Sequence, residues 1–594
     1  MKEDNRLVSE LYNKYLLSSV LAILFSTVGQ IVNNVVIGNA VSSDKLSVTG
    51  LVLPIYYVFA TVGNLMAIGG SAVCSRLMTE RETRPARAAF TVTYAVTVAA
   101  CILLGALTIL LLPAIIPFLG TPDALYEDVY QYALVMCLGG VFTAGIYLSF
   151  NFLRMDGKTV AASLVFVVMG VVNVLLDYLF VVVGDMGVMG ISLATSLGAM
   201  CASVLGALAL FLRGSSVRLT RIGMKDLRVY GGEIVRVGSP GAVENICILI
   251  KSFLMNRILA PLGGSLALGA YSVLNSVNGF AQAFIYGASG TIVPFVGVFS
   301  TEKDTRAIRG ILAQSLVKGA ALTLPVMLFC LIFPETVASV FGLSGEAALS
   351  VAVPAIRLFS LSFLPALVAN LLISLHLSNS RTALANVLTA LRSCALVVPL
   401  SALIGGTLGI SFMWNAFWLA EIGTLLVAAV WQFITSRRDR ALSPLTLLDE
   451  SFESKGHDFS CAAENSVDSI MECVDGVREF CAGEDMPPKK AMRLSLAVEE
   501  MLTSIRDHSL MDDKNLTISV RIMISSGTTI LRIRNRGKLF NPLSYYDKKR
   551  HGDELDLDAA LELTDSIGIK MIVDTCEIVY YRTTFGINNL TVIL

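Results

Sequence analysis

Long apolar runs, separated by short polar connections, fill the first three quarters of this 594-residue chain. A helix needs ~20 apolar residues to cross the hydrocarbon core of a bilayer, and such runs recur up to Phe433. Only 15% of the residues are charged and the mean hydropathy is +0.70, which excludes a soluble globular protein for this region. We expect twelve spans, at residues 15–36, 48–70, 90–112, 132–150, 160–183, 191–212, 242–260, 270–298, 320–333, 351–375, 384–404 and 410–433.

Basic residues gather in every second connection between these spans. They are Arg76, Arg81, Arg84 and Arg87; Arg154 and Lys158; Arg213, Arg218, Arg221, Lys225 and Arg228; Lys303, Arg306 and Arg309; Arg381; and Arg437, Arg438 and Arg440. The other connections hold little positive charge, with Lys45 as the main exception. Because basic loops are retained on the cytoplasmic side, both termini are predicted to be cytoplasmic.

Three short motifs recur at nearly one offset, which indicates an internal repeat. Residues 79–84 (TERETR) match 301–306 (TEKDTR) at an offset of 222, and the pairs Thr159/Thr382 and Gly190/Gly409 lie in similar motifs at offsets of 223 and 219. Six predicted spans separate the members of each pair, so the halves are predicted to be parallel repeats. We expect two V-shaped lobes, at 1–220 and 221–436, enclosing a central cavity and working by alternating access.

Several dispersed segments resemble the MATE family of multidrug and toxic-compound extrusion proteins. They are residues 31–38 (IVNNVVIG), 69–76 (GGSAVCSR), 172–178 (VNVLLDY), 238–241 (GSPG), 259–264 (LAPLGG), and 357–359 (RLF) with Pro365. The resemblance covers residues 10–435 and implies export of organic, often cationic, substrates in exchange for H+ or Na+, with no other cofactor. It further implies a multi-pass protein of a bacterial-type plasma membrane, a transporter rather than an enzyme.

Asp177 is the first candidate for an ion-coupling residue, because a charge within hydrocarbon costs ~2.5–3.5 kcal/mol on insertion scales. Asn173 lies four residues earlier and therefore on the same helix face. The resemblance implies that this pair belongs to an ion site of the N-terminal lobe. Asn33 completes the candidate site, although many relatives carry Asp there; one carboxylate is therefore replaced by an amide. A structural role for Asp177 near a helix end is the alternative.

The candidate substrate cavity includes Glu244, Lys251 and Asn34. Glu244 and Lys251 are seven residues apart, hence on one helix face two turns apart. Lys251 is either an internal counter-charge that a cationic substrate or proton displaces, or a partner needed for insertion alone. Arg357, Arg392 and Glu421 also lie in or near apolar spans, and the resemblance implies structural roles for Arg357 and Glu421.

The eleven cysteines are scattered and form no CxxC motif. We interpret most of them as small buried apolar residues, and we predict neither a metal site nor a disulfide. No nucleic-acid-binding motif is present in the sequence.

A linker at 437–454 leads to a cytoplasmic α/β two-layer domain at 455–594. The residue pattern predicts helix, helix, strand, strand, loop, a helix near 568–575, and a closing hairpin at 577–581 and 590–594. With residues 496–504 (LAVEEMLTS) and 540–543 (FNPL), it resembles the Bergerat-type ATPase domain of anti-sigma-factor serine kinases. Glu500 and His508 match positions of that family.

This domain departs from the kinase pattern at two ligand positions. Ser504 stands where the Mg2+-binding Asn is expected, and Asn535 where the adenine-reading Asp is expected. Mg2+ needs well-placed oxygen ligands, so phosphoryl transfer is not predicted. A degenerate nucleotide pocket would comprise Glu500, Ser504, Asn535, Gly537 and Gly568. The open alternatives are a regulatory or partner-docking module, nucleotide binding without catalysis, and an active kinase.

The sequence therefore predicts a secondary antiporter of small organic substrates, working as a monomeric unit in a lipid bilayer. Its tail domain is predicted to be regulatory, with a possible protein partner. A lipid-linked oligosaccharide flippase of the same superfamily, or a solute sensor that signals through the tail domain, are the alternatives.

Overall fold

The computed structural model describes residues 2–79, 83–156, 158–211, 218–301, 304–379, 381–448, 457–510, 517–525, 528–535, 537–538, 540, 578–584 and 587–593. The chain divides into two compact units, and each is described by itself. The membrane body comprises residues 15–294 and 312–431. The tail unit comprises residues 1–14, 295–311 and 432–594.

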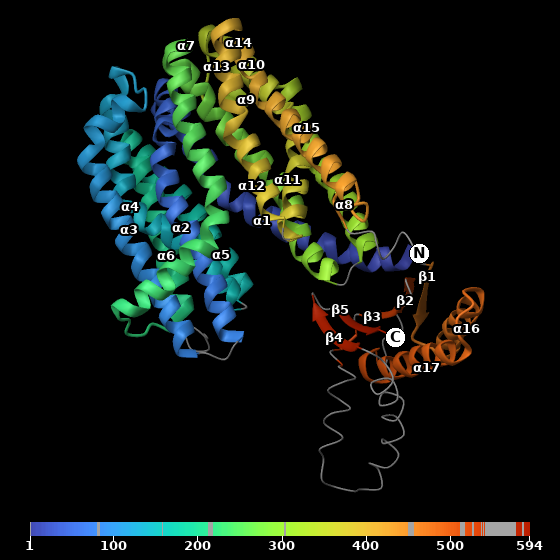
Figure 1. Ribbon diagram of the computed structural model, residues 1–594. Helices are drawn as coiled ribbons and strands as arrows, with labels where there is room; N and C mark the ends of the chain where they lie inside the picture. Colours follow the sequence, from blue (N-terminus) through green and yellow to red (C-terminus); the bar gives the residue numbers. More distant parts are fainter. Residues whose placement is uncertain are drawn as a thin grey trace. The chain divides into compact units, whose positions relative to one another are not determined.

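Long apolar helices build the first repeat (Figure 1). They are α1 (Lys2–Val36), α2 (Ser47–Thr79), α3 (Thr83–Phe118), α4 (Tyr126–Met155), α5 (Thr159–Asp177) and α6 (Gly187–Phe211). Two π-helices extend them, η1 (Ile37–Val41) after α1 and η4 (Tyr178–Val183) after α5. Pro54 in α2 and Pro113 in α3 lie inside helices, where membrane proteins tolerate proline because neighbouring groups satisfy the freed carbonyls.

The helices of the second repeat are interrupted more often than those of the first. It comprises α7 (Met224–Thr301), α8 (Thr305–Ile332), α9 (Pro334–Val340), α10 (Glu346–Ser360), α11 (Phe363–Ser378), α12 (Thr382–Ala390), the π-helix η5 (Leu391–Ala395), α13 (Val397–Leu408), α14 (Ile410–Met413) and α15 (Asn415–Arg438). Within α7, Gly264 has φ 55° and ψ −142°, so the element is two helices joined at a kink. Glycine reaches this backbone conformation at no side-chain cost, and the kink falls between the predicted seventh and eighth spans.

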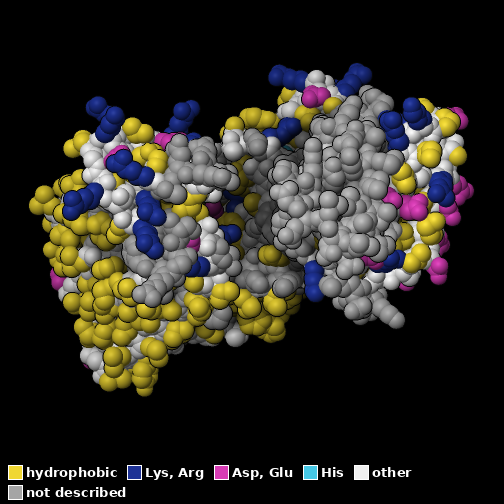
Figure 2. Space-filling model, turned by 90° about the horizontal axis from the view of Figure 1, so that it is seen from below, with side chains coloured by type: hydrophobic (Ala, Val, Ile, Leu, Met, Phe, Trp, Pro, Cys, Tyr) yellow, Lys and Arg dark blue, Asp and Glu magenta, His cyan; other side chains and the backbone are white. Residues whose placement is uncertain are grey.

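Nine helices within the described residues are long and apolar enough to cross a membrane, and the bent pair α10 and α11 makes a tenth. Counting the two halves of α7 separately and adding α1, which covers the first predicted span, accounts for the twelve predicted spans. On the membrane body, Figure 2 shows a hydrophobic flank and Lys and Arg side chains gathered on the end face. That distribution is typical of a protein with a lipid-facing belt.

The two repeats meet backbone to backbone at one end of the membrane body. Gly38 in η1 lies against the carbonyl of Phe341, and Gly342, with φ 76°, lies against the carbonyl of Gly38. The Asn39 amide donates to the Val340 carbonyl at 2.9 Å beside this contact. A Cβ atom at either glycine would overlap main-chain atoms of the other repeat.

The tail domain is a two-layer α/β structure. Its sheet has the order β1-β2-β3-β5-β4 and comprises β1 (His457–Glu464), β2 (Thr517–Ser525), β3 (Thr528–Asn535), β4 (Ile578–Thr584) and β5 (Ile587–Ile593), all antiparallel. The helices α16 (Val467–Gly483) and α17 (Pro488–Ile505) pack against one sheet face and enclose an apolar core. From α16 onward, the described helices and strands follow the predicted order. The helix predicted near 568–575 lies outside the described residues.

Two predictions for this domain were wrong. The first strand, β1, was missed because only eight residues, partly polar, form an edge strand whose pairing with β2 a local pattern cannot reveal. The structure also joins Cys461 in β1 to Cys473 in α16 by a disulfide, where no disulfide was predicted. These cysteines are twelve residues apart in sequence, and only the packing of α16 on β1 brings them together.

Candidate ion and substrate site

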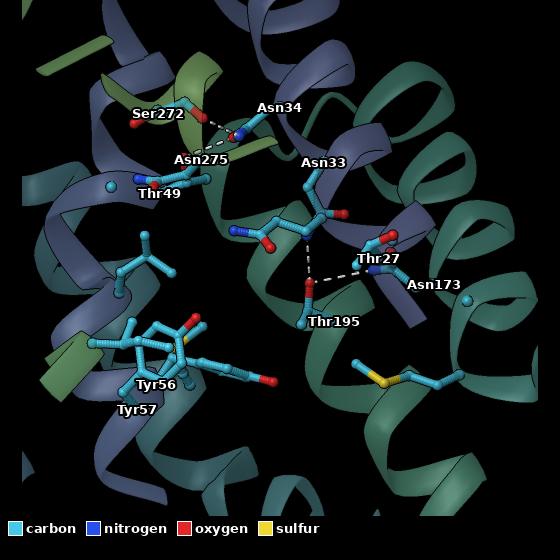
Figure 3. A pocket seen from close by; sticks show the side chains of 18 of the residues that line it. Thr27, Asn33, Asn34, Thr49, Tyr56, Tyr57, Asn173, Thr195, Ser272 and Asn275 are labelled. Atoms are coloured by element: carbon cyan, nitrogen blue, oxygen red, sulfur yellow. Dashed lines mark hydrogen bonds between the residues drawn. The ribbon is translucent and has the colours of Figure 1, made fainter. Parts of the chain in front are cut away.

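Four polar side chains from three helices converge inside the first repeat. With the Asn33 amide oriented so that all its partners are satisfied, its nitrogen donates to Asp177 Oδ2 at 2.7 Å, Asn173 Oδ1 at 3.1 Å and the Gly29 carbonyl at 2.9 Å, and its oxygen accepts from Thr195 Oγ1 at 2.9 Å. The Asn173 amide also donates to Thr195 Oγ1, at 3.2 Å (Figure 3). The structure thus brings together all three residues predicted for ion coupling.

Small residues allow these helices to approach. A Cβ at Gly29 in α1 would lie 2.7 Å from Asn173 Oδ1, and one at Gly198 in α6 would lie 3.3 Å from the Asn173 backbone nitrogen. Asn173 and Asp177 share one face of α5 because they are four residues apart. The α-helix ends at Asp177 and continues as the π-helix η4, an irregularity that often occurs at functional sites.

Asp177 is fully buried, with 0% of its surface exposed. Its Oδ1 atom has no hydrogen-bond partner among the described residues, and no described lysine or arginine pairs with the carboxyl group. A carboxylate in this position must bind a cation or take up a proton, since an isolated buried charge is unfavourable.

A cavity of about 360 Å³ opens beside this cluster. Asn33, Asn173 and Thr195 line one side of it, and Tyr56 and Tyr57 of α2 lie on another (Figure 3). The remaining wall is mostly polar or aromatic, from residues such as Gln30, Tyr132, Tyr147, Glu244, Asn275 and Tyr286. Aromatic rings with polar tips suit organic substrates of varied shape.

Asn34 also lines this cavity, but its amide serves to join helices. It donates to Ser276 Oγ at 2.6 Å and to the Ser272 carbonyl at 3.2 Å, and it accepts from Thr49 Oγ1 at 2.7 Å. Successive residues of a helix point about 100° apart. Asn33 therefore faces the first repeat and Asn34 faces α7.

A second cavity, of about 230 Å³, holds both Glu244 and Lys251. The Glu244 carboxylate accepts a hydrogen bond from the Tyr286 hydroxyl. Lys251 forms no ion pair with the described residues. Arg392 and Glu421 line the same cavity and form a buried, two-pronged ion pair, with Arg392 Nη2 2.8 Å and Nε 3.1 Å from the carboxylate.

In the tail domain, the side-chain oxygen of Asn535, one of the predicted nucleotide residues, is engaged by described residues. The Asn535 side-chain oxygen accepts from Ser509 Oγ at 2.9 Å, from the Gly537 backbone nitrogen at 2.9 Å and from Asn588 Nδ2 at 3.0 Å. Asn535 and Asn588 are buried, so the oxygen that would face adenine is already used. Glu500 and Ser504 lie on α17, and Gly568 lies outside the described residues.

Sequence reasoning missed Thr195 and the tyrosines of the first cavity. Tyr56 and Tyr57 lie side by side in an apolar span, a pattern that could have suggested a cavity lining. Thr195 carried no comparable signal, because a threonine within a helix most often bonds its own backbone. Within the described residues, no group of three or more His, Cys, Asp or Glu side chains could hold a metal ion.

Comparisons with known proteins match the membrane body. The family model described as MatE matches residues 19–179 and 240–403. The multidrug export protein MepA of Staphylococcus saprophyticus is 24% identical over 275 residues, 46% of this chain and 60% of that protein. MepA of Staphylococcus aureus is 22% identical over 283 residues, 47% of this chain and 62% of that protein. The chain thus spans about 60% of the length of the curated relatives it matches.

Solved structures show the same fold. The MATE multidrug transporter DinF-BH, in complex with R6G, aligns with a TM-score of 0.61 and 22% identity, covering 74% of this chain and 97% of its own. An inward-facing MATE family transporter of the MOP superfamily aligns with a TM-score of 0.59 and 19% identity, covering 70% and 96%. The predicted fold class is confirmed. Because the family model matches more than half of the sequence in two blocks, one in each repeat, the chain belongs to the MatE family.

Proposed function

We propose that this protein is a secondary antiporter that exports small organic substrates in exchange for H+ or Na+ by alternating access. The observation that carries the proposal is the buried Asp177, with one carboxylate oxygen unpartnered, beside a polar and aromatic cavity in the membrane body. The multidrug export relatives and the MatE family assignment support the same class of function.

The contacts of Asn33 provide a path by which ion binding at Asp177 changes the shape of the cavity. Asn33 touches Asp177 on one side and lines the cavity on the other. When Asp177 takes up a proton or a cation, its carboxyl group becomes a weaker acceptor for the Asn33 amide. The change in hydrogen bonding would shift α1 against α5 and α6, and α1 is also joined to α7 through Asn34. A change at one buried acid thereby reaches both repeats.

Glu244 and Lys251 are the two charged residues that we propose act in the substrate cavity. Both line the second cavity, and Glu244 also lines the first. We propose that Glu244 attracts cationic substrates and that Lys251 is the internal counter-charge that the cation displaces. Among the described residues that line this cavity, Arg392 is held by Glu421 and Lys251 is in no ion pair, so Lys251 is the cation that we expect to move.

Export can be measured in everted membrane vesicles. The wild-type protein should accumulate a cationic dye when an outward H+ or Na+ gradient is imposed across the vesicle. Glu244→Gln should raise the KM for the cationic dye about tenfold, the value of one charge-assisted contact, and leave a neutral substrate unaffected. Glu346→Gln, an exposed acid at the start of α10, is the matched control. An equal effect on cationic and neutral substrates would contradict the role of Glu244.

We further propose that the tail domain is a regulatory module, to which a protein partner could bind, and that it does not transfer phosphate. The purified full-length protein is expected to release no phosphate from Mg2+-ATP above the rate of its Glu500→Gln variant. The physical reasons are the engaged oxygen of Asn535 and the short side chain of Ser504. Turnover that needs Mg2+ and falls in Glu500→Gln would show an active ATPase instead.

A further inference from the structure

Asp304 lies in the connection between the eighth and ninth spans, yet it is completely buried within the tail unit. Its carboxylate meets three arginines of the tail domain. Arg521 Nη1 lies 2.9 Å from Oδ1, and Arg534 Nη2 and Arg532 Nη1 lie 3.0 and 3.2 Å from Oδ2. Oδ1 also accepts from the Ala307 backbone nitrogen at 3.0 Å, at the start of α8. One side chain thus both caps α8 and binds the sheet.

The arginines occupy the sheet face opposite the apolar core. Arg521 on β2 is directly paired with Arg532 on β3, and Arg534 follows two residues later on the same face. Side chains of like charge directly opposite one another destabilise a sheet. Even so, all three arginines are buried, with 2–7% of each side chain exposed. Three buried positive charges this close together are stable only with a negative charge between them, and the Asp304 carboxylate provides it.

Other contacts extend the same interface. Arg306 Nη1 lies 2.8 Å from Asp458 Oδ2 on β1, and the Arg534 guanidinium lies over the ring of Phe299, 4.9 Å from its centre. Burial opposes ionisation of Asp304, but Arg534, Arg532, Arg521 and the Ala307 N–H outweigh it and hold the pKa of its carboxyl well below the ordinary 3.8. The group is therefore charged throughout the physiological pH range.

We infer that this arginine face is the docking surface of the tail domain, that its partner is the connection between α7 and α8 with Asp304 as the recognised carboxylate, and that the tail domain acts on transport through this contact. The second part rests on the proposed transport function. Residues 295–301 end α7 and residues 305–311 begin α8, and both segments belong to the tail unit. A change in the contact between the tail domain and Asp304 therefore acts directly on the end of α7 and the start of α8.

The internal repeat offers a matched control. Asp304 lies in TEKDTR, and Glu82 holds the corresponding place in TERETR of the first repeat. The two motifs differ little in charge, so Glu82→Gln removes an equivalent carboxylate from the other half of the chain.

Docking is tested by hydrogen exchange on the full-length protein. In Asp304→Asn, amide exchange in β2 and β3 and in the first turn of α8 should be about tenfold faster or more, because removing the anion leaves buried arginines uncompensated. Protection in α16 and α17 should persist, which shows that the domain is still folded. Glu82→Gln should leave all of these segments unchanged. Unchanged protection in Asp304→Asn, or an equal loss in Glu82→Gln, would overturn the docking assignment. Arg521→Gln provides the reciprocal variant and should reproduce the Asp304→Asn pattern.

Regulation is tested by comparing export rates in vesicles. The family model matches residues 19–179 and 240–403, and α15 ends at Arg438, so a chain that ends at Arg438 keeps both matched blocks and all the helices of the membrane body. Asp304→Asn should change the export rate by the same factor as this truncation, and combining the two should add nothing. A truncation without effect, or additive effects, would overturn the regulatory part. If the wild-type protein exports nothing, the proposed transport function fails, while hydrogen exchange still decides the docking.

Discussion

Asp177→Asn is expected to reduce ion-driven export to the level of vesicles without transporter, while the protein still inserts and folds. The asparagine side chain has nearly the same shape, and it can keep the contact with Asn33 by reversing its amide. It cannot take up a proton, and it offers no charge to bind Na+. The coupling ion then has no site, and a gradient cannot drive the transport cycle.

The measurement is dye accumulation in everted vesicles under separate H+ and Na+ gradients, with membrane insertion followed by detergent extraction and size-exclusion profile. Asp185→Asn is the matched control, because Asp185 is an exposed acid that follows the same π-helix. Wild-type export by Asp177→Asn under either gradient would remove Asp177 from the mechanism. Equal losses in both variants would point to a general defect.

Arg392→Met is expected to be the most destabilising of the substitutions considered in the membrane body. The guanidinium is held by Glu421 in a two-pronged pair and by Asn370 Oδ1 at 3.1 Å, and both members of the pair are buried. Removing one partner of a buried pair costs ~3–5 kcal/mol, whereas replacing both by apolar residues is often neutral. The double variant Arg392→Met with Glu421→Leu should therefore recover most of the lost stability.

Thermal unfolding of the purified protein in detergent measures this effect. Arg357→Met is the control. The resemblance implied a structural role for Arg357, but its side chain is exposed on α10 in the same repeat, so its replacement should change stability by no more than ~0.5 kcal/mol. If the double variant is as unstable as Arg392→Met, the instability does not come from leaving Glu421 buried without its partner, and this explanation is wrong.

Arg392 also explains why one lobe, and not both, offers an ion site in our proposal. At the offset of 219 residues found for Gly190 and Gly409, Arg392 corresponds in sequence to Asn173 of the first repeat. Where the first repeat has an amide beside an unpaired acid, the second has a fixed cation paired with an acid. Glu421 is thus paired with a cation, whereas Asp177 has no paired lysine or arginine among the described residues.

The large features of this fold follow from the sequence because they depend on local patterns. Apolar runs predict spans, and the convergence of Asn173 with Asp177 follows from helical spacing alone. The kink at Gly264 also lies where two runs were separated. Each of these features is decided within a few residues of the chain, so pattern reasoning recovers it.

Other features depend on contacts between distant segments, which local patterns cannot reveal. The strand β1 was missed because it is stabilised by pairing with β2, 60 residues further on. The role of Thr195 depends on how α6 packs against α1 and α5. Asp304 sits in a charged connection, and such a residue is usually solvated; only the folded tail domain turns it into a buried anion.

The glycine contact between the repeats limits how they can separate at this end of the membrane body. Since main chain rests on main chain at Gly38 and Gly342, side-chain rotation alone cannot release this part of the contact. Separating the repeats at this point requires the two backbone segments to move apart, and a side chain larger than glycine at either position would prevent them from meeting.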